Sequence, residues 1–203
     1  YHPFFLQCAE KYNKVFYVLG NHEHYHGDYQ STLSNLRWHL PREITVLDNQ
    51  SEYYRGVHFV GATLWTNFDI DPKQIDDARF YMNDYHCISN GDKPLQPEDT
   101  LQENMDTKKW FDQCVPMLKQ APIVMITHHA PSVRSLHGRY LNSAPAYANH
   151  MEEFIKKHPA ITHWFSGHCH FSNDYMIEQC RMISNPGGYH KCEENASFDI
   201  GME

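Results

Sequence analysis

The chain has 203 residues, of which 41% are hydrophobic and 14% are aromatic. This length and composition fit one folded domain with a buried core, and they exclude an intrinsically disordered chain. The formal net charge is -8 at pH 7, and without a basic run we expect no stable binding of duplex nucleic acid. An acidic surface still permits an anionic substrate, because a bound metal ion can reverse the local charge.

The six cysteines are spread along the chain, and none forms a Cys-x-x-Cys pair. This spacing argues against a thiolate zinc site and favours free thiols in a reducing compartment. The sequence has neither an apolar run of membrane-spanning length nor a signal peptide. We therefore expect a cytoplasmic protein without membrane association, although a chain that begins at Tyr1 need not begin at the native start.

The first half of the chain alternates strands and helices. Residues 14–19 form a β-branched and aromatic run, which predicts a buried strand. Residues 28–40 carry apolar side chains at helical spacing and predict a helix. A second strand is expected at 57–65. Residues 66–97 are polar and rich in turn-forming residues, so they predict a long surface excursion of the kind that often contacts substrate.

The second half continues this alternation. Thr100 and Glu103 have the spacing of a capping box, which predicts a helix that starts at Thr100 and ends near Pro116. A strand, a helix, a strand and a hairpin are then expected at 122–127, 146–157, 161–167 and 175–184. The alternation favours a layered α/β fold with a single domain over residues 1–203.

Three of the predicted strands are followed directly by side chains that can bind a metal ion. These side chains are Asn21 and His22, His128 and His129, and His168 and His170. Any one histidine alone would be read as a solvated side chain. Because ligand sites form where the carboxyl ends of parallel strands open to solvent, we expect the three loops to converge. Imidazole nitrogens with an amide oxygen suit zinc, manganese, iron or nickel rather than calcium. On extended backbone, His168 and His170 would point to the same side and reach one site together.

The three motifs resemble those of the calcineurin-like metallophosphoesterases. The similar segments, in chain order, are "GNHE" (20–23), "LWTNF" (64–68), "MNDYHCI" (82–88), "PEDT" (97–100), "THHAPS" (127–132), "GHCH" (167–170) and "NPGGY" (185–189). They look like those of a bacterial and phage subgroup, and the resemblance covers nearly the whole chain. It implies a sandwich of two stacked mixed β-sheets flanked by helices, with a pair of divalent metal ions at the carboxyl ends of the central strands.

The resemblance implies a role for each matching residue. Asn21, His128 and His168 would bind one metal ion, and His170 would bind the other. His22 would be the general acid that protonates the leaving oxygen, or would stabilise charge in the transition state. The two ions, whether manganese, zinc, iron or nickel, would share a hydroxide that attacks phosphorus in line. The expected reaction is therefore hydrolysis of a phosphoester substrate by a phosphatase or phosphodiesterase.

The sequence also departs from the family pattern. Family members carry an Asp-x-His motif and then a Gly-Asp-x-x-Asp motif before the Asn-His motif, whereas the twenty residues before Asn21 contain neither. We therefore expect that this chain lacks the first βαβ segment of the fold and could hold only one metal ion by itself. One alternative is a catalytically inactive scaffold that keeps a metal ion and binds a partner. Another is a metalloenzyme that cleaves amides, but the sequence lacks a signature such as His-Glu-x-x-His.

Candidate substrate contacts lie in two loops. Arg134, Arg139 and Tyr140 follow the "THHAPS" segment and could reach a phosphate, where arginine would make a forked contact. Asn83 and Asp84 lie in the long excursion and are candidates for the substrate side of the site. The simpler alternatives are a solvated loop for the first group and a turn held by Asx hydrogen bonds for the second.

Overall fold

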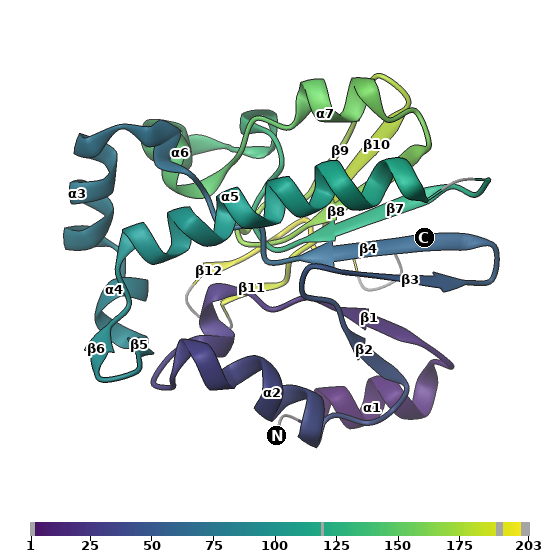
Figure 1. Cartoon of the computed structure of the whole chain (residues 1–203), viewed down its shortest axis with the longest axis horizontal. Coiled ribbons are helices and arrows are strands. Elements are labelled where there is room, and N and C mark those ends of the chain that lie inside the picture. Colours follow the sequence, from purple (N-terminus) through teal and green to yellow (C-terminus); the bar gives the residue numbers. More distant parts are fainter. Residues whose placement is uncertain (1–2, 119, 190–192, 200–203) are drawn as a thin grey trace.

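The computed structural model describes residues 3–118, 120–189 and 193–199. At its centre is a six-stranded mixed sheet with the order β3-β4-β7-β8-β10-β9 (Figure 1). The strands are β3 (Gln50–Tyr54), β4 (Val57–Ala62), β7 (Ile123–Thr127), β8 (Ile161–Ser166), β9 (Asn173–Ile177) and β10 (Cys180–Ser184). The four inner strands run parallel, and the edge strands β3 and β9 are antiparallel to their neighbours. The carboxyl ends of the inner strands therefore open at one end of the sheet.

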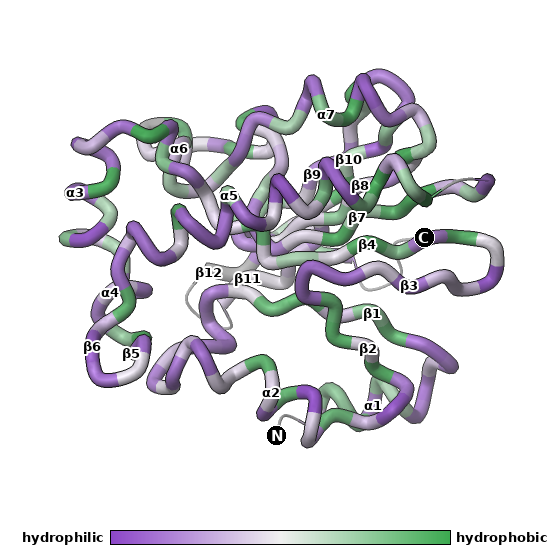
Figure 2. Tube along the Cα trace, in the orientation of Figure 1, coloured by the Kyte–Doolittle hydropathy of each residue, from purple (hydrophilic) through white to green (hydrophobic). Residues whose placement is uncertain are grey.

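Helices α5 (Pro97–Cys114) and α7 (Glu152–Lys157) cover one face of this sheet (Figure 1). Their buried side chains Phe111 and Ile155 join a cluster with Val60, Met125 and Trp164 of the strands. Hydrophobic residues are concentrated along β4, β7 and β8, while the helices alternate between hydrophobic and hydrophilic residues (Figure 2). This is the pattern expected when a sheet is buried and its covering helices are amphipathic.

A small parallel sheet lies on the other face. It consists of β1 (Val15–Tyr17) and β2 (Ile44–Val46), with α1 (Pro3–Lys11) and α2 (Tyr29–His39) on its outer side (Figure 1). Phe16 stacks on Phe59 of the large sheet with the ring centroids 4.1 Å apart. A Cβ atom at Gly61 would lie 2.5 Å from Leu47 Cβ, so the layers approach too closely for a side chain there. Among the described residues, the second sheet of the expected sandwich thus has two strands.

The remaining elements are short. They are η1 (Asn21–His24), η2 (Phe68–Ile70), α3 (Pro72–Tyr81), α4 (Asp84–Cys87), β5 (Ser89–Asn90), β6 (Lys93–Pro94), η3 (Val115–Met117), η4 (Val133–Ser135), η5 (Gly138–Ser143), α6 (Ala144–Tyr147), β11 (Gly188–Tyr189) and β12 (Glu193–Glu194). Within the described ranges, no helix combines the length and the apolar character that crossing a membrane requires.

The segment at 66–97 differs from the expected surface excursion. It forms α3, α4 and the β5–β6 pairing, and it contributes Phe68, Tyr85, Ile88 and Leu95 to a second buried cluster. Each of these side chains is at most 4% exposed. The elements are too short to show a periodic pattern in the sequence. The many polar residues between them therefore suggested a loop, whereas the segment is a folded layer that packs beside α5.

Two helix boundaries also differ from the prediction. The backbone N–H of Gln96 donates to Asp99 Oδ2 at 2.9 Å, and α5 begins at Pro97 rather than at Thr100. Thr100 is fully buried, with its hydroxyl 2.9 Å from that of Tyr85. The helix expected at 146–157 is divided into α6 and α7. The intervening backbone instead pairs with the segment after β7, as in the bond from Asn149 N–H to the Ala130 carbonyl (2.8 Å).

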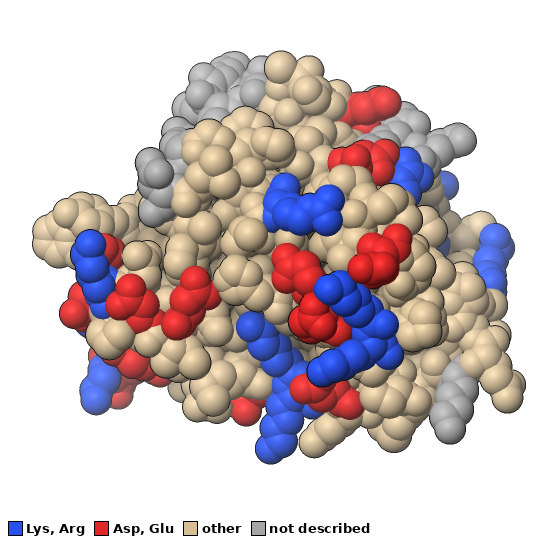
Figure 3. Space-filling model, turned by 90° about the horizontal axis from the view of Figure 1, so that it is seen from above, with Lys and Arg blue, Asp and Glu red and all other residues tan. Residues whose placement is uncertain are grey.

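Charged side chains on the face shown in Figure 3 are interspersed, with lysines and arginines lying among aspartates and glutamates. Pairs of opposite sign occur within single elements, such as Lys156 with Glu153 on α7 (2.7 Å). Arg181 of β10 pairs across the hairpin with Asp174 of β9 (2.7 Å). Basic side chains on this face are mixed with acidic ones (Figure 3).

Candidate functional site

Three of the predicted ligands meet where the two sheets face each other. Asn21 follows β1 of the small sheet, whereas His128 and His168 follow the neighbouring strands β7 and β8 of the large one. His128 Nε2 lies 3.0 Å from Asn21 Oδ1 and 3.1 Å from His168 Nδ1. The structure thus brings one amide oxygen and two imidazole nitrogens together, as expected from the strand ends, although the first strand belongs to a different sheet.

Gly20 allows this approach. A Cβ atom on Gly20 would lie 2.4 Å from His128 Cε1 and 2.5 Å from His128 Nδ1. The φ angle of Gly20 is -99°, which any residue can adopt, so a glycine is required here by the lack of space and not by backbone conformation. The imidazole of His128 lies directly against the backbone before Asn21, and this contact sets the position of the ring.

Asp84 orients Asn21. The Asn21 Nδ2 donates to Asp84 Oδ1 at 2.6 Å, and the Tyr25 hydroxyl donates to the same oxygen at 3.0 Å. Because the amide nitrogen is engaged by Asp84, the amide oxygen faces the two imidazoles. Burial raises the pKa of Asp84, and the two hydrogen bonds oppose that shift. Asp84 is only 2% exposed, yet it lines the same cavity as Asn21 and His22, and its contact with substrate stays a prediction.

Both imidazoles are held neutral. Burial is the main cause that lowers the pKa of His128 to about 4; the negative charge of Glu23 opposes this shift, and neighbouring histidines add to it. Burial and the neighbouring rings lower the pKa of His168 well below its usual value. Neutral imidazole is the form that binds metal ions. In the neutral form each imidazole has one ring nitrogen with a lone pair that can bind a metal ion.

The donor set fits a divalent transition metal or zinc. Two imidazoles and an amide oxygen are the mixed donors typical of manganese, zinc, iron and nickel. The φ angle of His168 is 61°. Such backbone strain in a residue other than glycine is typical of functional sites. Among the residues described, no three His, Cys, Asp or Glu side chains form a metal site, so the third donor here is an amide.

His22 and His170 lie at the rim of this site. A cavity of about 220 Å³ is lined by both of them together with Asn21 and His168. His22 is exposed, stacks on Tyr25 at 4.2 Å, and has its Nε2 2.7 Å from the hydroxyl of Tyr189. The Tyr189 ring also contacts that of His170 edge-on at 4.4 Å. We did not predict Tyr189 from the residues; its only signal was its place at the end of the "NPGGY" segment.

The backbone that carries His168 and His170 is not extended, so that expectation was wrong. The Cys169 N–H bonds the Gly167 carbonyl and the Phe171 N–H bonds the Cys169 carbonyl, both at 2.7 Å. These are two successive tight turns, and both histidines still line the same cavity. Cys169 is 2% exposed, and burial raises the pKa of its thiol to about 12. The protonated thiol is a poor target for oxidation.

The adjacent histidines after β7 have different surroundings. His129 is 1% exposed, and its Nδ1 lies 3.4 Å from the carbonyl oxygen of Thr63. Its ring packs between those of Trp65 and His168, with centroid distances of 5.1 and 4.3 Å. Of these two histidines, His128 makes the three-donor contact. It is also the residue to which the family resemblance assigns metal binding.

The candidate substrate residues are distributed differently. Asn83 is exposed and lines the cavity. Tyr140 also lines it, but is 8% exposed and packs edge-on against Tyr147 at 4.8 Å. The guanidinium of Arg134 lies 4.6 Å above the ring of Tyr175 and does not line the cavity, while the side chain of Arg139 lies outside the described part of the structure. Substrate contact by Asn83 and Tyr140 stays a prediction.

Comparison with known proteins identifies the family. Residues 2–172 match the calcineurin-like phosphoesterase family. This chain belongs to the calcineurin-like phosphoesterases. The match includes the predicted ligands and His22, while Tyr189 lies beyond it. The resemblance seen in the three histidine-bearing motifs is confirmed.

Relatives of this phosphoesterase extend the comparison. The chain is 30% identical over 209 residues to Uncharacterized protein L509 of Acanthamoeba polyphaga mimivirus, covering 92% of this chain and 72% of that protein. Its fold is similar to that of the phosphopantetheinyl hydrolase PptH from Mycobacterium tuberculosis, with a TM-score of 0.65, 14% identity, and 92% and 73% of the two chains covered. TT1561 of Thermus thermophilus gives a TM-score of 0.51 at 13% identity, with 91% and 68% covered. At these identities the two structures support the fold alone, which confirms the expected α/β class with a large mixed sheet flanked by helices.

Proposed function

We propose that this phosphoesterase uses a divalent metal ion held by Asn21, His128 and His168. The observation that supports this most directly is the meeting of three donor atoms, with His128 Nε2 3.0 Å and 3.1 Å from the other two. A divalent ion bound there would supply Lewis-acid stabilisation of the charge on the phosphoryl group. The contribution of the protein is to keep both imidazoles neutral and to direct the Asn21 oxygen toward them through Asp84.

His22 is proposed to deliver a proton to the leaving oxygen. Its ring is exposed at the cavity rim, and stacking on Tyr25 and the 2.7 Å contact with Tyr189 hold its orientation. General acid assistance of this kind is typically worth about 10²–10⁴ in rate. Replacement of His22 by alanine should therefore slow phosphoesters with poor leaving groups far more than activated aryl phosphates. Equal slowing of both would argue against the acid role.

A second metal ion at His170 remains part of the proposal for the complete site. His170 lines the same cavity as His168. The described residues bring no set of carboxylates to His170, so a second ion would require additional donors. For the chain by itself, one ion is the expected stoichiometry.

Metal binding and turnover test the proposal together. Chelator-treated protein would be titrated with Mn²⁺ or Zn²⁺ by calorimetry, and hydrolysis of bis(p-nitrophenyl) phosphate would be followed with and without the metal. We expect one ion per chain, loss of that ion in His128→Ala, and metal-dependent turnover. The matched control is His39→Ala, because His39 is an exposed histidine on α2.

The outcomes separate the alternatives. A His128→Ala variant that keeps its ion at the original affinity would exclude this ligand set. One bound ion without turnover of any phosphoester would instead favour an inactive scaffold that binds a partner. Turnover that persists after complete removal of metal would contradict metal dependence.

A further inference from the structure

The cavity beside the three donor atoms has an aromatic wall. No described lysine or arginine lines it. Five tyrosines do: Tyr25, Tyr81, Tyr140, Tyr147 and Tyr189. A substrate with further phosphates beyond the reacting one would call for cationic side chains in this wall. Aromatic rings instead favour a flat, weakly polar group next to the phosphate, because such a group can stack on them.

Tyr81 is the most accessible of these rings. It is 76% exposed at the end of α3, so its face is open to a ligand. A second cavity, of about 320 Å³, shares Tyr81, Met82 and Tyr147 with the first and continues between α3 and α6. Tyr81 and Tyr147 thus stand at the junction of the two cavities. The neighbouring Phe80 is 72% exposed and lines neither cavity.

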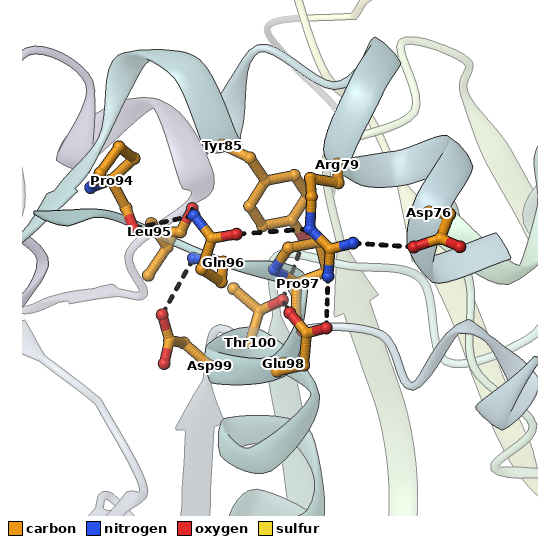
Figure 4. A network of polar contacts seen from close by, with 10 residues as sticks. All are labelled: Asp76, Arg79, Tyr85, Pro94, Leu95, Gln96, Pro97, Glu98, Asp99 and Thr100. Carbon is orange, nitrogen blue, oxygen red and sulfur yellow. Dashed lines mark hydrogen bonds and ion pairs between the residues drawn. The ribbon is translucent and has the colours of Figure 1, made fainter. Parts of the chain in front are cut away.

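The end of α3 is fixed in place by a polar network on α5 (Figure 4). Arg79 donates to Gln96 Oε1 at 3.3 Å and forms an ion pair with Glu98. The hydroxyls of Tyr85 and Thr100, 2.9 Å apart, tie α4 to the same helix. The segment that carries Tyr81 is therefore held to α5 on both sides. A ring on a fixed segment loses less conformational entropy when a ligand binds.

Asn83 adds a polar group to this wall. It lies on the same fixed segment, is exposed, and makes no side-chain cap of α4. A side-chain amide carries both donors and an acceptor, and this combination matches the edge of a nucleobase. A plain aryl group has no such edge, so the amide distinguishes the two kinds of planar ligand.

We propose that the substrate is a nucleoside phosphate whose base stacks on Tyr81, beside Tyr147, and bonds through its edge to Asn83. The base would lie at the junction of the two cavities while the phosphate reaches the three donor atoms. The position of the phosphate rests on the proposed function, whereas the site for the base is inferred from the residues of the aromatic wall alone.

Binding of adenosine to the metal-free chain tests the site for the base without any turnover. We expect adenosine to bind more tightly than ribose by at least about fivefold, since stacking on an aromatic side chain is worth that much or more. Tyr81→Ala should remove this advantage, and Phe80→Ala should keep it. Asn83→Ala should weaken adenosine while leaving the affinity for indole unchanged, because indole is a flat ring without the polar edge of a base.

Kinetics with Mn²⁺ then separate this inference from the proposed function. We expect a lower KM for adenosine 5′-monophosphate than for glycerol 2-phosphate, and a difference that Tyr81→Ala abolishes. Hydrolysis of both with equal KM, or adenosine bound no better than ribose, overturns the inference and leaves the hydrolase intact. Adenosine binding that depends on Tyr81, in a chain that neither binds metal nor hydrolyses phosphoesters, overturns the proposed function alone.

Discussion

Replacing Gly20 by alanine tests how the site is assembled. The new Cβ would lie 2.4 Å, 2.5 Å and 2.8 Å from Cε1, Nδ1 and Nε2 of His128, whereas ordinary contact begins at 3.4 Å. Because three ring atoms are affected together, the ring cannot escape by turning in its own plane. It must retreat as a whole by about 1 Å, the difference between the ordinary and the shortest distance.

A displacement of this size removes His128 from the ligand set. Metal–ligand distances tolerate deviations of about 0.2 Å, and disturbing only an outer partner of a ligand already costs about 10–100-fold in affinity. We therefore expect Gly20→Ala to weaken Mn²⁺ binding by at least about 100-fold, which corresponds to about 2.7 kcal/mol. Calorimetric titration of the chelator-treated protein measures this change.

Gly167→Ala is the matched control. A Cβ atom on Gly167 would lie 3.7 Å from His128 Nδ1, which is an ordinary contact, so its affinity for Mn²⁺ should stay close to that of the unmodified protein. Thermal unfolding of the metal-free proteins shows whether both variants fold. A folded Gly20→Ala protein that binds Mn²⁺ as well as Gly167→Ala does would refute the reasoning.

Three further changes probe the surroundings of the site. Asp84→Asn should weaken Mn²⁺ binding by about 10–100-fold in calorimetry, because it loosens the hold on the Asn21 amide. The control Asp76→Asn, at an exposed residue, should leave the affinity for Mn²⁺ unchanged. Equal losses of affinity in the two variants would contradict the orienting role of Asp84. Tyr189→Phe should lower kcat for alkyl phosphoesters by about tenfold, the worth of one hydrogen bond, with Mn²⁺ affinity retained; an unchanged kcat would show that the hydroxyl has no part in catalysis. Burial lowers the pKa of His24 to about 4 from 6.5, so the unfolded chain takes up a proton first as the pH falls, and stability declines from pH 6.5 toward pH 4. The free energy of unfolding of the unmodified protein, measured with urea, should thus fall by about 2 kcal/mol more between pH 7 and pH 5 than that of His24→Phe. Equal losses in the two proteins would argue against a neutral buried imidazole at His24.

Several strands could be predicted because each is a contiguous apolar run, whereas β2, with three residues, and β3, which is largely polar, were not predicted. β1, β4, β7 and β8 lie within the predicted segments, and the hairpin at 175–184 corresponds to β9 and β10. The meeting of Asn21, His128 and His168 could be predicted for the same reason, because the ends of such strands place them; their binding of a metal ion stays a prediction.

What could not be predicted depends on contacts between residues distant in sequence. Asp84 is 63 positions from Asn21, and nothing local distinguishes it from the other aspartates of its segment. Tyr189 reaches His22 from 167 positions away. Thr100 resembles a cap by spacing, but its hydroxyl is buried against Tyr85. The turns at 167–171 replace an extended backbone because of hydrogen bonds that the residue types do not indicate.

The meeting of two separate layers at one point has a mechanical consequence. An ion bound by Asn21, His128 and His168 would link the small sheet to the large one, in addition to direct contacts between the layers such as Phe16 on Phe59. The affinity for the ion would then depend on how closely the two layers pack. A methyl group at Gly61, remote from any ligand, would push the two layers apart and thereby weaken ion binding.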